Sequence, residues 1–162
     1  MLMRKLTFFI ALTCLFSSSC AAKQYRDTIS CVDLANDLAS EISDSADYSA
    51  YTEGDVDYFF GDNTIFEDFY FIYSTSSDDI SEIGVFKSES EEEAQKMLLK
   101  SQSYISNVKQ EKSAFIENYL PEEMQKLNGA RAERFGRYVI LVFEAPDKAK
   151  ELLEYSEKLL KE

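Results

Sequence analysis

The sequence predicts an α+β fold, in which helices pack on an antiparallel sheet of about four strands. Short aromatic and β-branched runs between polar segments predict strands at 69–73 and 83–86. After the second strand, apolar residues recur at three- and four-residue spacing, which predicts a long helix ending near Tyr119. With 162 residues, 45% of them hydrophobic, the chain has the size and composition of one folded domain.

The first half of this domain has one clear helix and one ambiguous segment. A helix is expected from about Ser30 to Ser43, with Ser30 as its cap. Residues 53–63 fit either one helical turn closed by Gly61 or a short extra strand, and the turn is favoured. The apolar stripe of the first helix consists of Cys31, Leu34, Leu38 and Ile42.

The central strands and the long helix follow. The strand at 69–73 is apolar on both faces, which indicates an inner strand of the sheet. Gly84 in the next strand would let a bulky side chain lie close to the backbone. Ser90 and Glu93 have the spacing of a capping box, so the long helix is expected to begin directly after Ser90.

The last third predicts a helix, two strands and a final helix. Residues 121–127 form a brief helix, and strands follow near 130–135 and 137–144 with Gly136 at the turn between them. The final helix runs from Pro146 to about residue 161.

The second strand-helix pair is similar to the first. Residues 83–86 with their helix can be aligned with residues 140–143 and the final helix. A duplicated strand-strand-helix unit is one interpretation. Chance is the other, because any strand followed by an amphipathic helix gives the same pattern.

The amino terminus predicts export. Basic residues precede the apolar run 6–16, and small residues and Cys20 follow it, which is the plan of a secretory signal peptide over residues 1–19. The segment resembles a bacterial lipoprotein signal, in which cleavage leaves a cysteine that receives a diacylglyceryl group. Cys20 is therefore the expected lipidation site, residues 20–29 the tether and residues 30–162 the domain. Cleavage after Ala22 is the alternative, and it would remove Cys20.

Composition excludes several functions. The net charge of -13 opposes binding to nucleic acid. The absence of histidine excludes Ser-His and Cys-His nucleophiles and imidazole zinc ligands. No glycine-rich phosphate loop is present, and Cys31 is expected to be a buried apolar thiol without a disulfide partner. The sequence therefore predicts no catalytic residue, no metal and no cofactor.

Acidic residues are the remaining candidates for catalysis or for metal binding. Carboxylate pairs could serve a glycosidase, but they also arise by composition in an acidic chain. The acids near residues 55–63 could bind calcium, although their spacing fails the calcium-binding helix-loop-helix pattern. The pairs are Asp55 with Asp57, Asp62 with Glu67, and Asp78 with Asp79, and the calcium candidates are Asp55, Asp57, Asp62 and Asn63.

Two groups of residues are candidate binding surfaces. Arg131, Arg134 and Arg137, with Lys126 nearby, could dock a carboxylate or phosphate, although alternation places Arg131 and Arg134 on opposite faces of a strand. The aromatic group could form a platform for glycans or peptides, but filling the core is the favoured role. That group consists of Tyr58, Phe59, Phe60 and Phe66.

Several motifs carry a family resemblance over about residues 30–145. They are the run 69–74, the segment 81–87 with its acid-capped helix, the step 119–123 and the run 136–142. The chain resembles the domain of unknown function 4358 family, whose members are small lipoproteins, chiefly of clostridial and related Firmicutes. The resemblance implies a lipoprotein address and supplies no catalytic residues.

The expected function is that of a non-catalytic binding or accessory module at the cell envelope. The chain is expected to be extracytoplasmic, attached to the membrane through Cys20, and to engage an unknown protein or envelope ligand. A secreted inhibitor without an anchor and a carboxylate-dependent glycan hydrolase are the alternatives.

Overall fold

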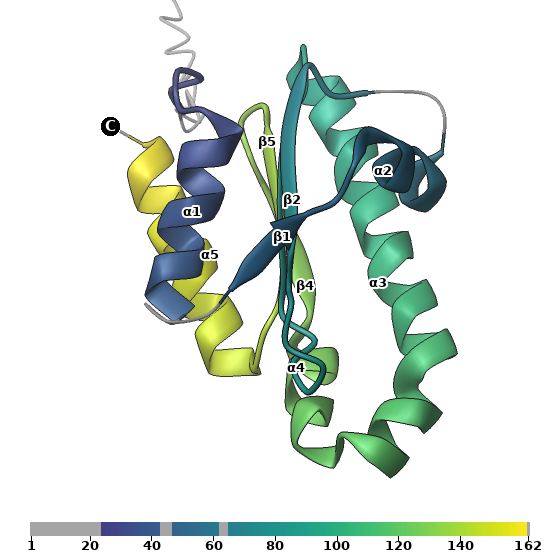
Figure 1. The fold of residues 1–162 in the computed structure, drawn as a ribbon. Coiled ribbons are helices and arrows are strands. Elements are labelled where there is room, and N and C mark those ends of the chain that lie inside the picture. Colours follow the sequence, from purple (N-terminus) through teal and green to yellow (C-terminus); the bar gives the residue numbers. More distant parts are fainter. Residues whose placement is uncertain (1–23, 43–46, 62–64, 162) are drawn as a thin grey trace, which may run out of the picture.

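The computed structural model describes residues 24–42, 47–61 and 65–161. One antiparallel sheet has the strand order β1-β2-β3-β5-β4 (Figure 1). Its strands are β1 (Tyr48–Ala50), β2 (Asp68–Ser74), β3 (Glu82–Lys87), β4 (Arg131–Phe135) and β5 (Tyr138–Phe143). The helices are α1 (Cys31–Ile42), α2 (Glu53–Phe60), α3 (Glu91–Tyr119), α4 (Met124–Gly129) and α5 (Pro146–Leu160), with a 3-10 turn η1 (Pro121–Glu123) before α4. The predicted α+β fold is confirmed.

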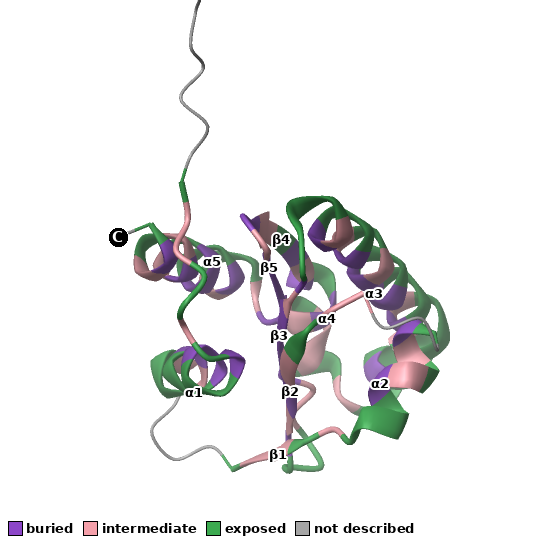
Figure 2. Ribbon diagram, turned by 90° about the horizontal axis from the view of Figure 1, so that it is seen from above, coloured by how far each residue is buried: buried purple, intermediate pink, exposed green. Residues whose placement is uncertain are grey.

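Helices cover both faces of the sheet. Figure 2 shows α1 and α5 on one side and α2 and α3 on the other. Along β3, Ile83 and Val85 belong to the core beneath α1 and α5, whereas Phe86 belongs to the core beneath α3. All six residues of β5 are buried. Both faces of the central strands are thus apolar because a helix packs on each of them.

The sheet has five strands in the described residues, one more than the four expected. The additional strand is β1, which pairs with β2 from Tyr48 opposite Ser74 to Ala50 opposite Ile72. Its three residues are too few to show an alternating pattern. Because β1 covers the outer side of β2, the prediction that 69–73 is an inner strand is confirmed.

The ambiguous segment after β1 is helical, as favoured. Thr52 caps α2, since its side chain accepts a hydrogen bond from the backbone of Asp55 while the Asp55 carboxylate accepts one from the backbone of Thr52. Gly61 ends the helix with a φ of 84°, a conformation that favours glycine. Ser90 caps α3 by accepting from the backbone N–H of Glu93, 3.2 Å away.

Gly84 permits close packing on the α3 face of the sheet. A Cβ at this position would lie 2.7 Å from a ring carbon of Phe86 and 3.3 Å from one of Phe71. The expected approach of a bulky side chain is therefore present, and it places two aromatic rings against the centre of β3.

The two strand-strand-helix units differ in the face that their helix covers. β3 and β5 are neighbours at the centre of the sheet, with β2 and β4 outside them. If the two units were related by a two-fold axis between β3 and β5, α3 and α5 would lie on the same face of the sheet. Instead α3 and α5 lie on opposite faces (Figure 2).

The segment before α1 lies against the domain. The Tyr25 ring packs edge-on against Phe135, with centroids 6.0 Å apart, and the Arg26 backbone N–H donates to the Leu160 carbonyl over 2.9 Å. Residues 24–29, the later part of the expected tether, are thus held beside α5. The signal peptide and Cys20 lie outside the described residues. Within those residues, no helix is long and apolar enough to cross a membrane.

Candidate functional site

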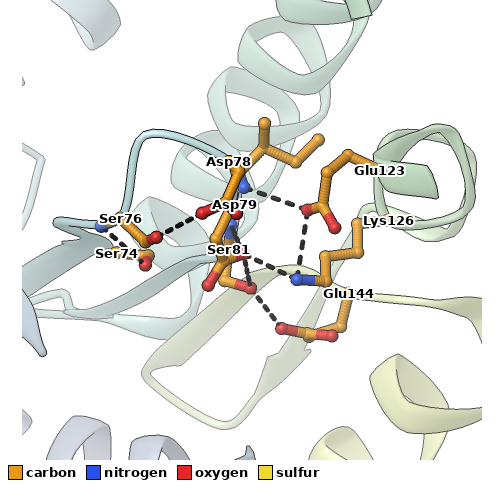
Figure 3. Close-up of polar contacts among 9 residues, drawn as sticks. Ser74, Ser76, Asp78, Asp79, Ser81, Glu123, Lys126 and Glu144 are labelled. Carbon is orange, nitrogen blue, oxygen red and sulfur yellow. Dashed lines mark hydrogen bonds and ion pairs between the residues drawn. The ribbon is translucent and has the colours of Figure 1, made fainter. Parts of the chain in front are cut away.

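Polar side chains gather at the end of the sheet where β2 turns into β3 (Figure 3). The ammonium of Lys126 lies 2.6 Å from the Asp79 carboxylate and 3.1 Å from that of Glu123. The Ser81 hydroxyl oxygen lies 2.6 Å from both the Asp79 and the Glu144 carboxyls. We call these five residues the loop cluster.

The protonation of the loop cluster follows from the single hydrogen of Ser81. One hydroxyl hydrogen can serve only one of two carboxyls, so the second must donate its own proton to the serine. Burial raises the pKa of Glu144, against weaker opposition from Ser81 and Lys126. Asp79 is partly buried, but hydrogen bonds from Lys126 and Ser81 outweigh this and lower its pKa to about 2. Of the two carboxyls that share Ser81, Glu144 is therefore the one that binds a proton more readily, and Asp79 the one that loses its proton more readily.

Glu82 is the next residue along β3 and faces the α3 side of the sheet. One oxygen of its carboxylate accepts from the Tyr51 hydroxyl over 2.9 Å, and the other accepts from the Tyr104 hydroxyl over 2.8 Å. Only 7% of Glu82 is exposed. Burial raises its pKa, and the two hydroxyls counter this only in part.

No lysine or arginine in the described part of the chain forms an ion pair with Glu82. The positive charge that acts on it most is that of Lys112, an exposed residue of α3. Glu82 is thus a buried carboxylate held by neutral donors.

A cavity of about 180 Å³, which we call the Glu82 pocket, opens beside this carboxylate. Ser74, Asp79, Ser81, Glu82 and Lys112 contribute polar groups to its lining, and Ile80, Val108, Ile116 and Phe143 contribute apolar ones. A second cavity, of about 210 Å³, shares Tyr51, Val108 and Lys112 with it. The Glu82 pocket is lined by Tyr51, Tyr73, Ser74, Asp79, Ile80, Ser81, Glu82, Val108, Lys112, Ile116 and Phe143.

Aromatic rings form one wall of the Glu82 pocket. Tyr51 and Tyr73 both line the pocket, and their ring centroids lie 4.5 Å apart. An electron-rich ring wall beside a buried carboxylate is suited to a positively charged group.

The chain matches the family described as Domain of unknown function (DUF4358) over residues 40–144. It belongs to this family. No curated protein and no solved structure matches the chain. The matched range contains every residue that lines the Glu82 pocket, so this site lies within the DUF4358 domain itself.

The arginines predicted as a ligand site do not converge in the DUF4358 structure. Ala132 packs beneath α3 and Phe135 beneath α5, so alternation along β4 places Arg131 on the α5 side and Arg134 on the α3 side. Arg131 donates to the Gly129 carbonyl over 3.2 Å, and Arg134 pairs with Glu91 at 3.1 Å.

Arg137 joins distant segments of the DUF4358 chain. Its guanidinium pairs with Asp27 at 2.7 Å, with Glu67, and with the Ser88 carbonyl at 2.7 Å. Its hydrogen-bonding groups are engaged within the domain, so it ties the segment before α1 to the sheet.

The predicted acid pairs have separate structural roles. The Asp55 carboxylate accepts hydrogen bonds from Thr52, the cap of α2, Glu67 pairs with Lys87 at 2.8 Å, and Asp78 accepts a hydrogen bond from Ser76. Asp62 and Asn63 lie outside the described residues. Within the described ranges, no three metal-ligating side chains meet.

The expected burial is found for Cys31 and for part of the aromatic group. Phe60 is buried in the core beneath α3, as favoured, and Phe59 packs against that core, whereas Tyr58 is 86% exposed and lines the second cavity. Phe66 packs against Phe69 and Phe86. Cys31 is a buried free thiol, as expected, and burial raises its pKa.

Sequence reasoning missed Glu82, although a signal was present. Residues 82, 84 and 86 share one face of β3, and that face carries Gly84 and Phe86 in the core. An acid on the same face would therefore be buried, and a buried carboxylate requires partners.

Proposed function

We propose that this DUF4358 protein is an exported lipoprotein that acts as a non-catalytic binding module at the cell envelope. Its anchor would be a diacylglyceryl group on Cys20, and its ligand would occupy the Glu82 pocket. The observation that carries the binding role is the cavity of about 180 Å³ beside a buried carboxylate that no cation in the described chain neutralises.

The side chains around the pocket support binding more than turnover. The Ser81 hydroxyl lies between two carboxyls. Neither is an imidazole base placed to remove the hydroxyl proton so that the serine could attack a substrate. Both oxygens of Glu82 are held by tyrosine hydroxyls, which fixes the carboxylate in one orientation. A fixed charge of this kind is a recognition element.

The proposed anchor agrees with the path of the chain beside α5. Cys20 precedes the first described residue, Gln24, by four residues, which span at most about 14 Å. A lipidated Cys20 would therefore hold the domain close to the membrane. Two acyl chains are sufficient for stable attachment.

Attachment to the membrane is tested by separating membrane and soluble fractions and measuring the mass of the amino terminus. A diacylated Cys20 in the membrane fraction is the expected result. An unmodified terminus at Lys23 in the soluble fraction would contradict the anchor and favour the secreted inhibitor.

The binding role is tested by native mass spectrometry of the chain extracted from membranes in a maltoside detergent. A small non-covalent adduct is expected on the wild type and on Glu133→Gln, and not on Glu82→Gln. Glu133 is the control because it is an exposed glutamate of β4 that does not line the pocket. A wild type without any adduct would count against a binding module.

A carboxylate-dependent hydrolase is the second candidate, and one observation favours it. Glu82 and Asp79 line the same pocket, and their surroundings raise the pKa of the first and lower that of the second to about 2. Opposed shifts of this kind distinguish an acid from a base in carboxylate enzymes. Hydrolysis of a glycan or peptide that both Glu82→Gln and Asp79→Asn abolish would establish this candidate.

A further inference from the structure

We propose that the Glu82 pocket binds a small organic ammonium ion, with the Glu82 carboxylate opposite its positive charge and the rings of Tyr51 and Tyr73 around its body. This inference rests on the proposed binding function and names the ligand class of the same site.

The Glu82 carboxylate forms no ion pair within the described chain. A carboxylate has about four lone-pair positions, and the hydroxyls of Tyr51 and Tyr104 occupy one on each oxygen. A buried ion without a counter-ion is costly, and an arriving cation would offset that cost. The pocket opens beside this carboxylate, so a ligand can reach it.

Aromatic and apolar side chains line the pocket beside this charge. The rings of Tyr51 and Tyr73 lie 4.5 Å apart, and both border the cavity. Ammonium groups are attracted to the faces of such rings. Val108, Ile116 and Phe143 add apolar surface for the carbon atoms of the ligand.

The volume of the pocket and the charges around it restrict the size and the charge of the ligand. A volume of about 180 Å³ suits a molecule smaller than the usual ligands of pockets of about 300–1,000 Å³. The net charge of -13 draws cations toward the domain. The exposed Lys112 also lines the pocket and would repel a second positive charge, so a monoammonium should bind better than a polyamine.

The test is an NMR titration of the full chain in maltoside micelles, with the tyrosine ring signals as the readout. The probes are butylammonium and choline, and their neutral counterparts are 1-butanol and 3,3-dimethyl-1-butanol. Both cations should shift the Tyr51 and Tyr73 signals saturably and bind about tenfold tighter than the neutral molecules. Equal binding of charged and neutral probes would overturn the inference.

Variants assign the binding to the pocket. Glu82→Gln should weaken butylammonium binding about tenfold, whereas Glu133→Gln, at an exposed position on the α5 side of β4, should leave it unchanged. Lys112→Gln should strengthen spermidine binding more than butylammonium binding. If Glu82→Gln fails to fold, Tyr73→Leu serves instead, because it removes part of the ring wall and should weaken both cations. Unchanged binding in the folded variant would contradict the assignment.

The two proposals can fail separately. An adduct on the membrane-extracted chain that depends on Glu82, together with no response to either cation, would refute the ammonium ligand and leave the binding module standing. No adduct and no response would refute both.

Discussion

Glu82 is the buried carboxyl at the centre of the proposed site. It occupies a core-facing position of an inner strand, where an ionised side chain needs compensation. Two tyrosine hydroxyls from separate elements supply that compensation at 2.9 and 2.8 Å. The carboxylate, in turn, satisfies two partly buried hydroxyls, so the three groups depend on one another.

We expect Glu82→Ala to lower the free energy of unfolding by about 2 kcal/mol or more, because it leaves the hydroxyls of Tyr51 and Tyr104 without their acceptor. Glu82→Gln should lower it less, since the amide can bond to both. Urea denaturation measures the difference. Glu133→Ala, at an exposed position of β4, is the control and should change the stability by no more than about 0.5 kcal/mol. Equal effects of the two glutamate-to-alanine changes would contradict the role given to Glu82.

At the residue scale, the sequence predicted only part of the site. Asp79 and Lys126 were both singled out, and they form an ion pair at 2.6 Å. Glu82 was not, because its partners Tyr51 and Tyr104 lie 31 and 22 residues away. No local pattern reports such contacts, since they depend on how α3 and the β1-α2 segment pack on the sheet.

At the scale of elements, periodicity located most of the helices and strands. The continuous apolar run in β2 and the three- and four-residue spacing in α3 were sufficient because each reflects burial against a large neighbour. β1 escaped prediction because three residues cannot show a period, and its position comes from pairing with β2. The faces covered by α3 and α5 depend on chain connections that the pattern does not encode.

Two glycines should respond in opposite ways to the same substitution. A Cβ at Gly129, at the end of α4, would lie 2.2 Å from the Glu144 carbonyl oxygen, so Gly129→Ala should destabilise the domain by about 3 kcal/mol. Gly54, in α2, has 3.9 Å to its nearest neighbour, and Gly54→Ala should stabilise by about 0.5–1 kcal/mol. Thermal unfolding of both variants compares them. A neutral Gly129→Ala would show that α4 does not pack against the end of β5 as described.

At the scale of the molecule, the carboxyls give stability a defined pH dependence. Asp79 has a lower pKa in the folded state, about 2 against the usual 3.8, so its contribution is complete above about pH 4 and is lost as the pH falls toward 2. Glu82 and Glu144 have raised pKa values, so the folded state holds their protons more tightly. Their contribution is present below the usual value of 4.5 and is lost as the pH rises through their folded-state values.

We therefore expect Asp79→Asn to flatten the acid limb of a plot of unfolding free energy against pH. Glu82→Gln and Glu144→Gln should each flatten the limb above about pH 4.5. Urea denaturation from about pH 2 to 8 gives these curves. Parallel curves for the wild type and Glu82→Gln would show that Glu82 is not buried as an unneutralised carboxylate.

The most direct test of the site is a carbon-13 NMR titration of the Glu82 carboxyl, with and without butylammonium. The groups that act on this carboxyl are the hydroxyls of Tyr51 and Tyr104 and the ammonium of Lys112, and Asp79 lines the same pocket. We expect a pKa above 4.5 in the free protein, because the carboxyl is buried, and a lower one when the cation binds beside it. A carboxyl whose pKa is near 4.5 and does not change with butylammonium would contradict both the burial of Glu82 and its proposed role in binding.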